Sequence, residues 1–340
     1  MTTLKAPFPW FGGKSRVADI VWKRFGDVPN YVEPFAGSLA VLLGRPSEAK
    51  TETVNDKDAF LANFWRALCN DPDGVAYWAD WPVNEADLHA RHWWLVNQIE
   101  HLEKMRTDPD YFDEKIAGWW VWGLCQWIGS GWCANAPDAK PSQQLPHLGD
   151  AGMGIHRPSQ KLPHLGDAGM GIHRPSQKLP HLLSNKGINA DRDNDLHAYL
   201  SALSERLRRV RVCCGDWQRV LGPSPTEKLG LTGVFLDPPY ADTAGRDADL
   251  YAVDSLTVAH DVREWAIANG DNPMLRIALC GYEGEHTMPA SWECVAWKTG
   301  GGYSSQNGNG NDNPHKERIW FSPHCLKMER LETMALFGGW

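Results

Sequence analysis

The sequence predicts an α/β protein built on a doubly wound, mostly parallel sheet, with a mainly helical region inserted into it. Two observations support this fold class. Short apolar runs with strand character end in glycine or acidic turns and alternate with stretches of helical spacing, both before residue 70 and after residue 195. The intervening stretch is instead rich in tryptophan, histidine and proline, and ten of the 18 tryptophans lie between Trp65 and Trp132.

The first part of the chain opens on a loop of prolines, glycines and aromatic residues over 7–14. Apolar spacing then predicts a helix over 16–25, a strand over 30–33, a helix up to Leu43 capped by Ser38, a strand over 51–54 and a helix over 58–69. The second strand ends at Asn55 and Asp56. Strand, glycine turn, helix and a strand with a terminal acid form the opening of a doubly wound domain.

The last part of the chain returns to the same alternation. The predicted elements are a helix over 196–207, a strand over 210–214, a strand ending at Asp237, a helix over 258–269, a strand over 274–280, and closing strands at 296 and 319–321 around a Gly/Asn-rich loop over 300–313. We therefore expect one discontinuous domain over 1–70 and 195–327, an inserted domain over 71–194 that is mostly helical up to about Ile128, and a C-terminal tail over 328–340.

Composition excludes several classes of protein. A content of 42% hydrophobic and 22% charged residues in 340 residues is ordinary for a soluble globular protein. The sequence contains no apolar run long enough to span a bilayer and no basic-then-apolar signal pattern at its N-terminus. The eight cysteines include no Cys-x-x-Cys pair, so we expect neither a disulfide framework nor a structural zinc site, and a reducing cytoplasm fits best.

The stretch Gly-Val-Phe-Leu-Asp-Pro-Pro-Tyr at 233–240 is the most informative part of the chain. Two consecutive prolines remove two backbone donors, so the chain has to leave the sheet directly after Asp237. The carbonyls of Asp237 and Pro238 remain as acceptors beside a carboxylate and the ring of Tyr240. This corner suits a planar heterocycle with an exocyclic amine, although a structural turn after a buried strand is the alternative.

Three further turns are expected at the carboxyl ends of parallel strands, where open α/β sheets bind ligands. Glu33 to Gly37 lets the backbone approach a ligand, although a tight turn also needs a glycine. Asp56 could bind the hydroxyls of a ribose or cap the next helix. Asp216 offers an acceptor for an adenine amine beside the ring of Trp217. Together these turns predict a site for an adenosine group.

Gly12-Gly13-Lys14-Ser15 is not a phosphate-binding loop of the NTPase type. That motif requires a glycine where Phe8 stands, and no buried strand precedes it here. A simple turn, or a lysine and a tryptophan closing over a small charged ligand, are the two remaining interpretations.

The middle of the chain contains a perfect tandem repeat. Residues 145–161 read LPHLGDAGMGIHRPSQK, residues 162–178 repeat all 17 letters, and a third copy stops after Leu182. Two short copies rich in Gly, Pro and His do not form a solenoid, so we expect a surface loop. The repeat is either a neutral insertion or a flexible basic arm that touches phosphates.

Net charge is −8, which argues weakly against a nucleic-acid partner, but the charge is unevenly distributed. From Lys140 to Lys186 there are six Lys or Arg against two Asp. A local basic segment can hold a polyanion whatever the charge of the whole chain.

Five separated motifs, in this order, carry a family resemblance: Pro9 to Lys14, Tyr31 to Ser38, Asn55-Asp56, Gly215 to Trp217 and Asp237 to Tyr240. They resemble the Dam-type adenine-N6 DNA methyltransferases, in which a target-recognition region lies between the cofactor and catalytic motifs. Lys316 to Pro323 resembles the closing strand of that family, and Leu39 stands where the family often has a second glycine. The resemblance implies a Rossmann-like methyltransferase fold and covers about residues 5–68 and 195–325.

The same resemblance implies S-adenosylmethionine as cofactor and no metal. The implied cofactor residues are Trp10, Gly12, Gly13, Lys14, Glu33, Pro34, Phe35, Ala36, Gly37, Ser38, Asp56, Asp216 and Trp217. The implied catalytic residues are Asp237, Pro238, Pro239 and Tyr240, of which Tyr240 stacks on a flipped-out adenine while Asp237 and Pro238 accept hydrogen bonds from its amine.

Double-stranded DNA is the implied partner, bound by a monomer or homodimer. Plausible DNA contacts in the inserted region are Arg91, His92, Lys140, Arg157, Lys161, Arg174 and Lys178. Related motifs also serve enzymes that act on cytosine-N4, RNA adenine or protein glutamine, but Asp in the first motif position favours adenine, and the motif order favours DNA. A regulator of the same fold that binds DNA without turnover is the alternative from another class.

Overall fold

The fold is described from a computed structural model. The structure describes residues 4–8, 10, 14–47, 50–82, 84–108, 110–127, 132–133, 196–239, 258–297 and 317–327. Gly12, Gly13, Tyr240, the tandem repeat and the loop predicted over 300–313 lie outside these ranges, as do the predicted DNA contacts from Lys140 onward.

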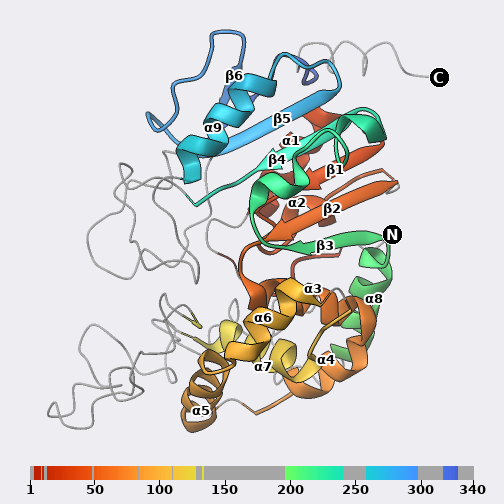
Figure 1. The fold of residues 1–340 in the computed structure, drawn as a ribbon, viewed down its shortest axis with the longest axis vertical. Helices are drawn as coiled ribbons and strands as arrows, with labels where there is room; N and C mark the ends of the chain where they lie inside the picture. The colour runs from red at the N-terminus through yellow and green to blue at the C-terminus, as the bar shows by residue number, and fades with distance from the viewer. Residues whose placement is uncertain are drawn as a thin grey trace, which may run out of the picture.

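A seven-stranded sheet forms one layer of the molecule (Figure 1). Its strands are β1 (Asn30–Glu33), β2 (Thr51–Asp56), β3 (Val210–Cys214), β4 (Thr232–Leu236), β5 (Leu275–Tyr282), β6 (Glu293–Ala296) and β7 (Glu317–Phe321), in the order β3-β2-β1-β4-β5-β7-β6. The pairs from β3 to β5 are parallel, whereas β7 is antiparallel to both β5 and β6. The predicted α/β class with a mostly parallel sheet is confirmed.

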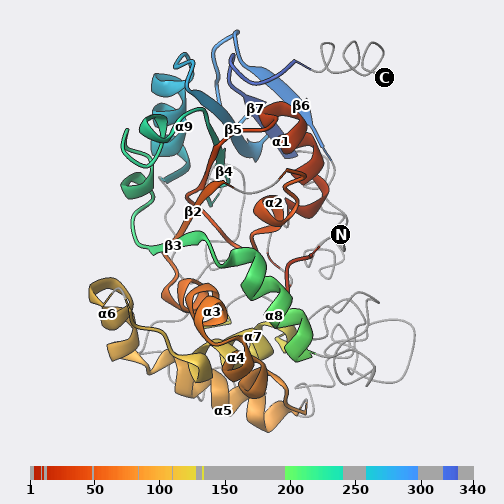
Figure 2. The ribbon, with the colours of Figure 1, turned by 90° about the vertical axis from the view of Figure 1, so that its right-hand side faces the viewer.

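Helices cover both faces of the sheet. Figure 2 shows α9 (Val258–Asn269) on one side and α1 (Ala18–Phe25) with α2 (Ala40–Leu43) on the other. Alternate residues of β4 serve the two faces: Phe235 packs in the hydrophobic cluster of α1 and α2, while Val234 and Leu236 pack in that of α9. Because both faces are buried, all five residues of β4 are inaccessible to solvent, as expected for a central parallel strand.

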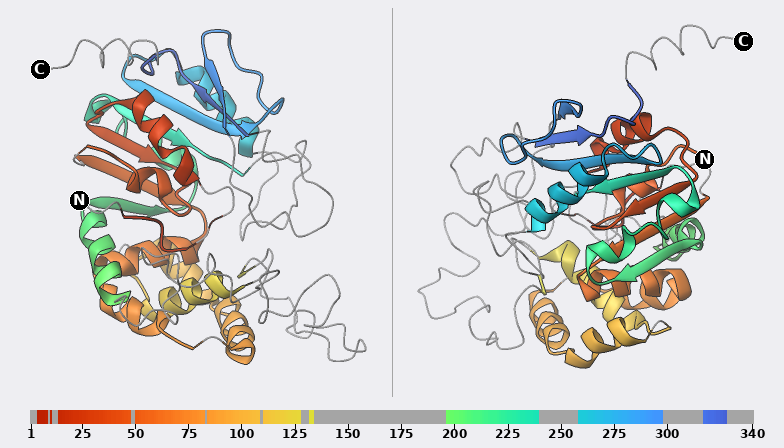
Figure 3. Two further views of the ribbon diagram at one scale, coloured as in Figure 1. Left: turned by 180° about the vertical axis from the view of Figure 1, so that it is seen from behind. Right: turned by 45° about the horizontal axis from the view of Figure 1, so that its top comes forward.

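The remaining helices form a second layer beside the β3 edge of the sheet (Figure 3). They are α3 (Ala59–Asn70), α4 (Pro72–Ala79), α5 (Glu85–Val96), α6 (Ile99–Thr107), α7 (Glu114–Gln126) and α8 (Leu196–Leu207). The domain boundary predicted at residue 71 falls between α3 and α4. The hydrophobic cluster is nevertheless continuous across it, since Trp65 of α3, Val75 of α4 and Trp120 of α7 belong to the same cluster as α1 and α2.

Local sequence explains where most of these elements begin. Asp58 caps α3 by accepting hydrogen bonds from the backbone of Phe60 and Leu61, and Pro72 opens α4 behind the capping side chain of Asp71. Gly233 lies inside β4 rather than at its start. A Cβ atom there would come within 2.8 Å of the ring of Phe25, so glycine permits the close approach of α1 to the sheet.

One predicted cap is wrong. Ser38 does not cap α2, because the helix begins one residue later than expected and its N-cap is Leu39, which makes no capping side-chain bond. Leu39 has a φ of 56°, in the left-handed region that favours glycine. This is the position where the Dam-type pattern often has its second glycine, and here a fully buried leucine adopts the glycine-like backbone.

Candidate active site

The acidic turns predicted from the sequence meet at one edge of the sheet. The sheet order reverses between β1 and β4, since β2 and β3 continue on one side of β1 and β5 on the other. Glu33, Asp56 and Asp237 stand at the carboxyl ends of β1, β2 and β4, and Asp216 follows β3. Open parallel sheets bind ligands at such a switch point.

Asp237 forms an ion pair with Lys14. Lys14 opens the short 3-10 helix η1 (Lys14–Arg16), and its Nζ lies 3.0 Å from Oδ1 of Asp237. Pro238 is buried and Pro239 is half-buried, at the point where the chain leaves the sheet after Asp237. Lys14, predicted as a cofactor residue, is therefore also a direct partner of the predicted catalytic acid.

The Lys14 ammonium is held in its charged form. Only 5% of the residue is exposed, and burial by itself lowers the pKa of Lys14. The carboxylates of Asp237 and Glu317 outweigh this effect, and the net result is a pKa raised above the ordinary value for lysine. A buried ammonium of this kind depends on its anionic partners.

Glu33, the last residue of β1, is buried near Asp237. The hydroxyl of Tyr31 donates a hydrogen bond of 3.0 Å to Oε2 of Glu33. Burial raises the pKa of Glu33 well above its usual range, and the carboxylates of Asp237 and Glu52 raise it further, while the Tyr31 bond acts in the opposite direction. Burial and the neighbouring carboxylates thus both disfavour the charged form of Glu33.

Trp10 lies against the glycine of the first turn. Gly37 has a φ of 47°, and a Cβ atom added there would come within 2.6 Å of Nε1 of Trp10. Trp65 holds the same glycine from α3, since its indole N–H donates to the carbonyl of Gly37 at 3.1 Å. Glycine is thus required here for both its backbone conformation and its contact with Trp10.

Asp56 and Asn55 hold the turns together. The Asp56 carboxylate accepts hydrogen bonds from the backbone N–H groups of Gly37 (3.2 Å) and Asp58 (3.0 Å), and its burial raises its pKa. Asn55 donates from one amide group to the carbonyls of Pro34 and Gly215, each at 3.0 Å. The side chain of Asn55 thus joins the turn after β1 to the turn after β3, a role that the sequence does not reveal.

Asp216 and Trp217 follow β3 at the same edge of the sheet. Asp216 is exposed and accepts a hydrogen bond of 2.9 Å from the backbone of Gln218, which starts the short helix η6 (Trp217–Val220). Trp217 is buried, and its ring lies 6.2 Å from that of the half-buried Phe35. The two predicted cofactor segments are therefore in contact.

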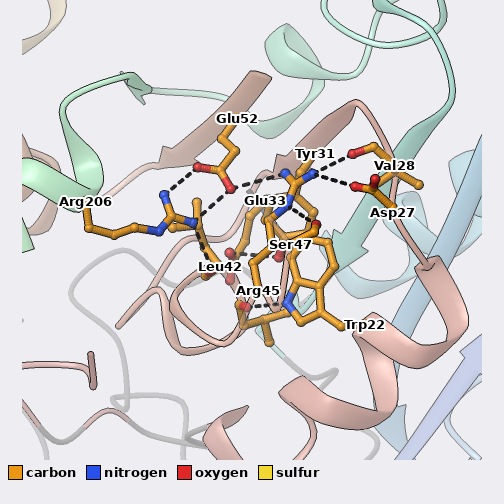
Figure 4. Close-up of polar contacts among 11 residues, drawn as sticks. Trp22, Asp27, Val28, Tyr31, Glu33, Leu42, Arg45, Ser47, Glu52 and Arg206 are labelled. Atoms are coloured by element: carbon orange, nitrogen blue, oxygen red, sulfur yellow. Dashed lines mark hydrogen bonds and ion pairs between the residues drawn. The ribbon is translucent and has the colours of Figure 1, made fainter. Parts of the chain in front are cut away.

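A network of buried ion pairs stabilises α2 and the turn over residues 33–37 that precedes it (Figure 4). Arg206 of α8 makes two hydrogen bonds to the Glu52 carboxylate, at 2.7 and 2.9 Å, and a third to the carbonyl of Leu42 in α2. Arg45 approaches the same carboxylate at 3.2 Å and bonds to the carbonyl of Val28. Glu52 of β2 thereby fixes α2, and the turn that precedes it, to α8.

Three residues of the site do not stand out in the sequence. Cys280 of β5, Trp297 after β6 and Glu317 of β7 are buried around Lys14. Only Glu317 lies in a segment with a motif, and that segment resembles a closing strand rather than a ligand site. The proximity of Trp297 and Glu317 depends on the antiparallel pairing of β7 with β5 and β6, which sequence spacing does not encode.

Arg91 and His92 do not lie where DNA contacts were expected. The guanidinium of Arg91 is enclosed by the rings of Trp81, Trp119 and Trp122, at 4.9, 4.9 and 4.3 Å from the centroids. His92 is buried and stacks on Trp127 at 4.9 Å. Aromatic faces attract a guanidinium and exclude water from it, so both side chains stabilise the helical layer instead of presenting to DNA.

Within the described part of the chain, no group of three His, Cys, Asp or Glu side chains is arranged to hold a metal ion. No helix in that part combines the length and apolar character that crossing a bilayer demands.

Comparison with known families bears on the same segments. Residues 10–115 match the D12 class N6 adenine-specific DNA methyltransferase family. This segment of the chain is thus similar to the adenine-N6 DNA methyltransferases. The matched segment includes Lys14, the turn after β1, Asp56 and the helices from α3 to the start of α7. It ends well before Asp237, so the corner after β4 stands on geometry alone. No curated protein gives a significant match to the sequence.

Proposed function

We propose that this methyltransferase is of the Dam type and transfers a methyl group from S-adenosylmethionine to a flipped-out adenine in double-stranded DNA. The observation that carries the proposal is the Asp237 carboxylate, which stands at the switch point of the sheet and is paired with Lys14. An anionic acceptor followed by a proline carbonyl is the chemistry that an exocyclic amine requires.

The residues at the edge of the sheet suit an adenosine-based methyl donor. Gly37 has no Cβ, so the backbone of this turn can approach a ligand at the edge of the sheet. Asp56 is half-buried at the same edge, and the exposed Asp216 precedes Trp217, whose ring lies 6.2 Å from that of Phe35. In this proposal Trp10 and Gly37 hold the methionine end, Asp56 the ribose hydroxyls, and Asp216 with Trp217 the adenine.

The target base is proposed to enter beside the corner after β4. An adenine inside the duplex cannot present its amine to Asp237, so it has to leave the base stack. The Asp237 carboxylate and the Pro238 carbonyl each accept a hydrogen bond from the exocyclic amine, and Tyr240 stacks on the adenine ring. These contacts orient the nitrogen lone pair and replace the water that would otherwise bind the amine.

When bound, S-adenosylmethionine supplies a sulfonium methyl group: the amine nitrogen forms the new N–C bond, the C–S bond breaks with its electron pair left on sulfur, and the amine releases a proton to solvent. The contribution of this chain is positioning and electrostatic, since Asp237 is already ion-paired and acts as a hydrogen-bond acceptor.

DNA recognition is proposed to reside in the inserted region over 71–194, with the basic stretch from Lys140 to Lys186 touching phosphates. Lys140, Arg157, Lys161, Arg174 and Lys178 remain proposed contacts. The tandem repeat gives Arg157 the same flanking sequence as Arg174, and Lys161 the same as Lys178. Arg91 and His92 are not included, because both are buried.

One experiment tests the proposal. The protein is incubated with radiolabelled S-adenosylmethionine and with plasmid DNA, RNA or protein acceptors, and the labelled nucleoside is identified after digestion. Label in N6-methyladenine of the DNA is the expected result. Label confined to RNA would overturn the choice of substrate, and donor binding with no transfer to any acceptor would favour a silent DNA-binding regulator.

A further inference from the structure

The ammonium of Lys14 is enclosed by residues from four different strands or their ends. Asp237, after β4, lies 3.0 Å from Nζ, and the ring of Trp297, after β6, lies 5.5 Å from it. Glu317, the first residue of β7, and the Cys280 thiol of β5 also act electrostatically on Lys14. On the other side of Asp237, Glu33 of β1 is close enough to interact with its charge.

The direction of β7 brings Glu317 to this place. Because β7 is antiparallel to β5, its first residue lies opposite the last residue of β5, with Glu317 paired to Tyr282. The carboxyl end of β5 is beside that of β4, so Glu317 reaches the edge that carries Asp237. Trp297 is fixed to the same point, since its backbone N–H donates to the carbonyl of Glu317 at 3.2 Å. Both side chains are buried.

The charges of this enclosure have a consequence for catalysis. If Asp237 were the sole carboxylate near Lys14, the buried pair would be neutral, and Asp237 would be a weak acceptor for an amine that gains positive charge during methylation. Glu317 brings a second buried carboxylate to this enclosure, and it acts on Lys14 in the same sense as Asp237, whereas burial raises the pKa of the Cys280 thiol well above its usual range. The single positive charge of Lys14 is thus shared between two carboxylates. A fixed negative charge in a water-poor site stabilises a developing cation.

We propose that Glu317 is a positioning residue of the methyl-transfer site. Together with Trp297, Glu317 holds the Lys14 ammonium in place, and its carboxylate balances part of the Lys14 charge. Asp237 therefore remains a strong hydrogen-bond acceptor for the target amine. The inference rests on the proposed function of Asp237. Glu317 acts through Lys14 and does not touch the base.

The kinetic test compares two charge-neutralising substitutions on neighbouring residues. Glu317→Gln removes the buried charge but keeps the shape, and Glu283→Gln removes an exposed carboxylate that pairs with Arg318 at 2.7 Å. We expect Glu317→Gln to lower kcat on plasmid DNA about 10-fold to 100-fold while KM for the methyl donor changes less than about threefold. Glu283→Gln is expected to match the wild type. Equal kcat values for Glu317→Gln and wild type would overturn the proposal.

The second test reads Lys14 directly and needs no turnover. The buried ammonium is followed by ¹H–¹⁵N NMR of lysine side chains, and its signal is assigned by its loss in Lys14→Met. In Glu317→Gln the loss of one carboxylate lowers the pKa of Lys14, so its titration moves about one to three pH units toward neutrality. The Cys280 thiol faces the same group, and Cys280→Ala in both backgrounds separates its titration. An unchanged Lys14 signal and titration in Glu317→Gln would show that Glu317 serves the fold alone.

The two tests distinguish the possible failures. If the wild type transfers no methyl group to DNA adenine, the proposed function is wrong whatever Lys14 does. If the wild type is active and Glu317→Gln retains both its kcat and its Lys14 titration, the proposed function stands and the inference about Glu317 is wrong.

Discussion

Lys14, near the start of the chain, lies 3.0 Å from Asp237 at the end of β4, and both belong to motifs that the sequence places in one site. The N-terminal loop therefore returns to the middle of the sheet and contributes a charge to the corner that the two prolines create.

Asp237→Ala is expected to abolish methyl transfer and to leave binding of the methyl donor largely intact, because Asp237 faces the target amine rather than the proposed adenosine site. Asp237→Asn serves as the companion variant, since alanine also removes the carboxylate that pairs with the buried Lys14 ammonium, at a cost of about 3–5 kcal/mol in stability. Label transfer and calorimetric binding of the donor are the two measurements. Turnover close to that of the wild type in either variant would contradict the assignment of the acid.

Gly37→Ala is expected to weaken binding of the methyl donor, because the new methyl group would come within 2.6 Å of Trp10 Nε1 and push the indole away from the turn. Gly284→Ala is the control: Gly284 also has a positive φ, of 84°, but a Cβ there meets nothing within 4 Å. Both variants pay the backbone cost of about 1–2 kcal/mol, and only Gly37→Ala should lose donor affinity. Equal affinities would show that the contact with Trp10 is irrelevant to binding.

Arg91→Ala is expected to destabilise the helical layer by about 2–4 kcal/mol, since it removes a guanidinium that packs on three tryptophan rings. DNA affinity of the folded variant should stay within about twofold of the wild type. Urea unfolding and a DNA binding titration provide the two measurements, and Arg208→Ala, on a largely exposed side chain, is the control for stability. A loss of DNA affinity at unchanged stability would restore Arg91 as a DNA contact.

Glu52→Ala is expected to cost about 3–5 kcal/mol of unfolding free energy, because it leaves the buried Arg45 and the partly buried Arg206 without their shared carboxylate. The exposed pair of Lys23 and Asp19 is the control. Its atoms are 2.6 Å apart, yet Asp19→Ala should change stability by at most about 0.5 kcal/mol, since solvent screens the pair. Similar costs for the two variants would mean that burial does not set the strength of these bridges.

The imidazole of His101 is expected to make folding pH-dependent. It is buried against Phe60, and burial lowers the pKa of His101 from 6.5 to about 4. The unfolded chain therefore binds a proton at His101 as pH falls through about 6.5, while the folded protein does not. The stability that the neutral His101 contributes is lost between pH 6.5 and pH 4, by at most about 3 kcal/mol. Asp58, whose pKa burial raises to about 7, changes stability in the opposite sense over the whole of this range.

His101→Gln isolates this contribution. The difference in unfolding free energy between wild type and variant should be constant above pH 7 and should shift against the wild type below pH 6. A difference that stays flat down to pH 4.5 would contradict a depressed pKa for His101.

Most secondary structure follows from local sequence. The helices at 196–207 and 258–269 and the strands at 30–33 and 210–214 begin and end where their apolar spacing predicts. The cap at Ser38 fails for a local reason that spacing does not contain. Leu39 takes up a left-handed backbone while its side chain stays in the hydrophobic core, and burial compensates for a conformation that leucine otherwise avoids.

Local sequence also placed the acids at the ends of strands, because a run of apolar residues that stops at a carboxylate marks where a buried strand reaches water. Local sequence does not determine which charged side chains lie close enough to interact. That depends on the order of the strands and the antiparallel direction of β7, which bring Lys14, Asp237 and Glu317 from distant parts of the chain to one buried point. It depends equally on the tryptophans that enclose Arg91, since burial is a property of the packed layer and not of the residue.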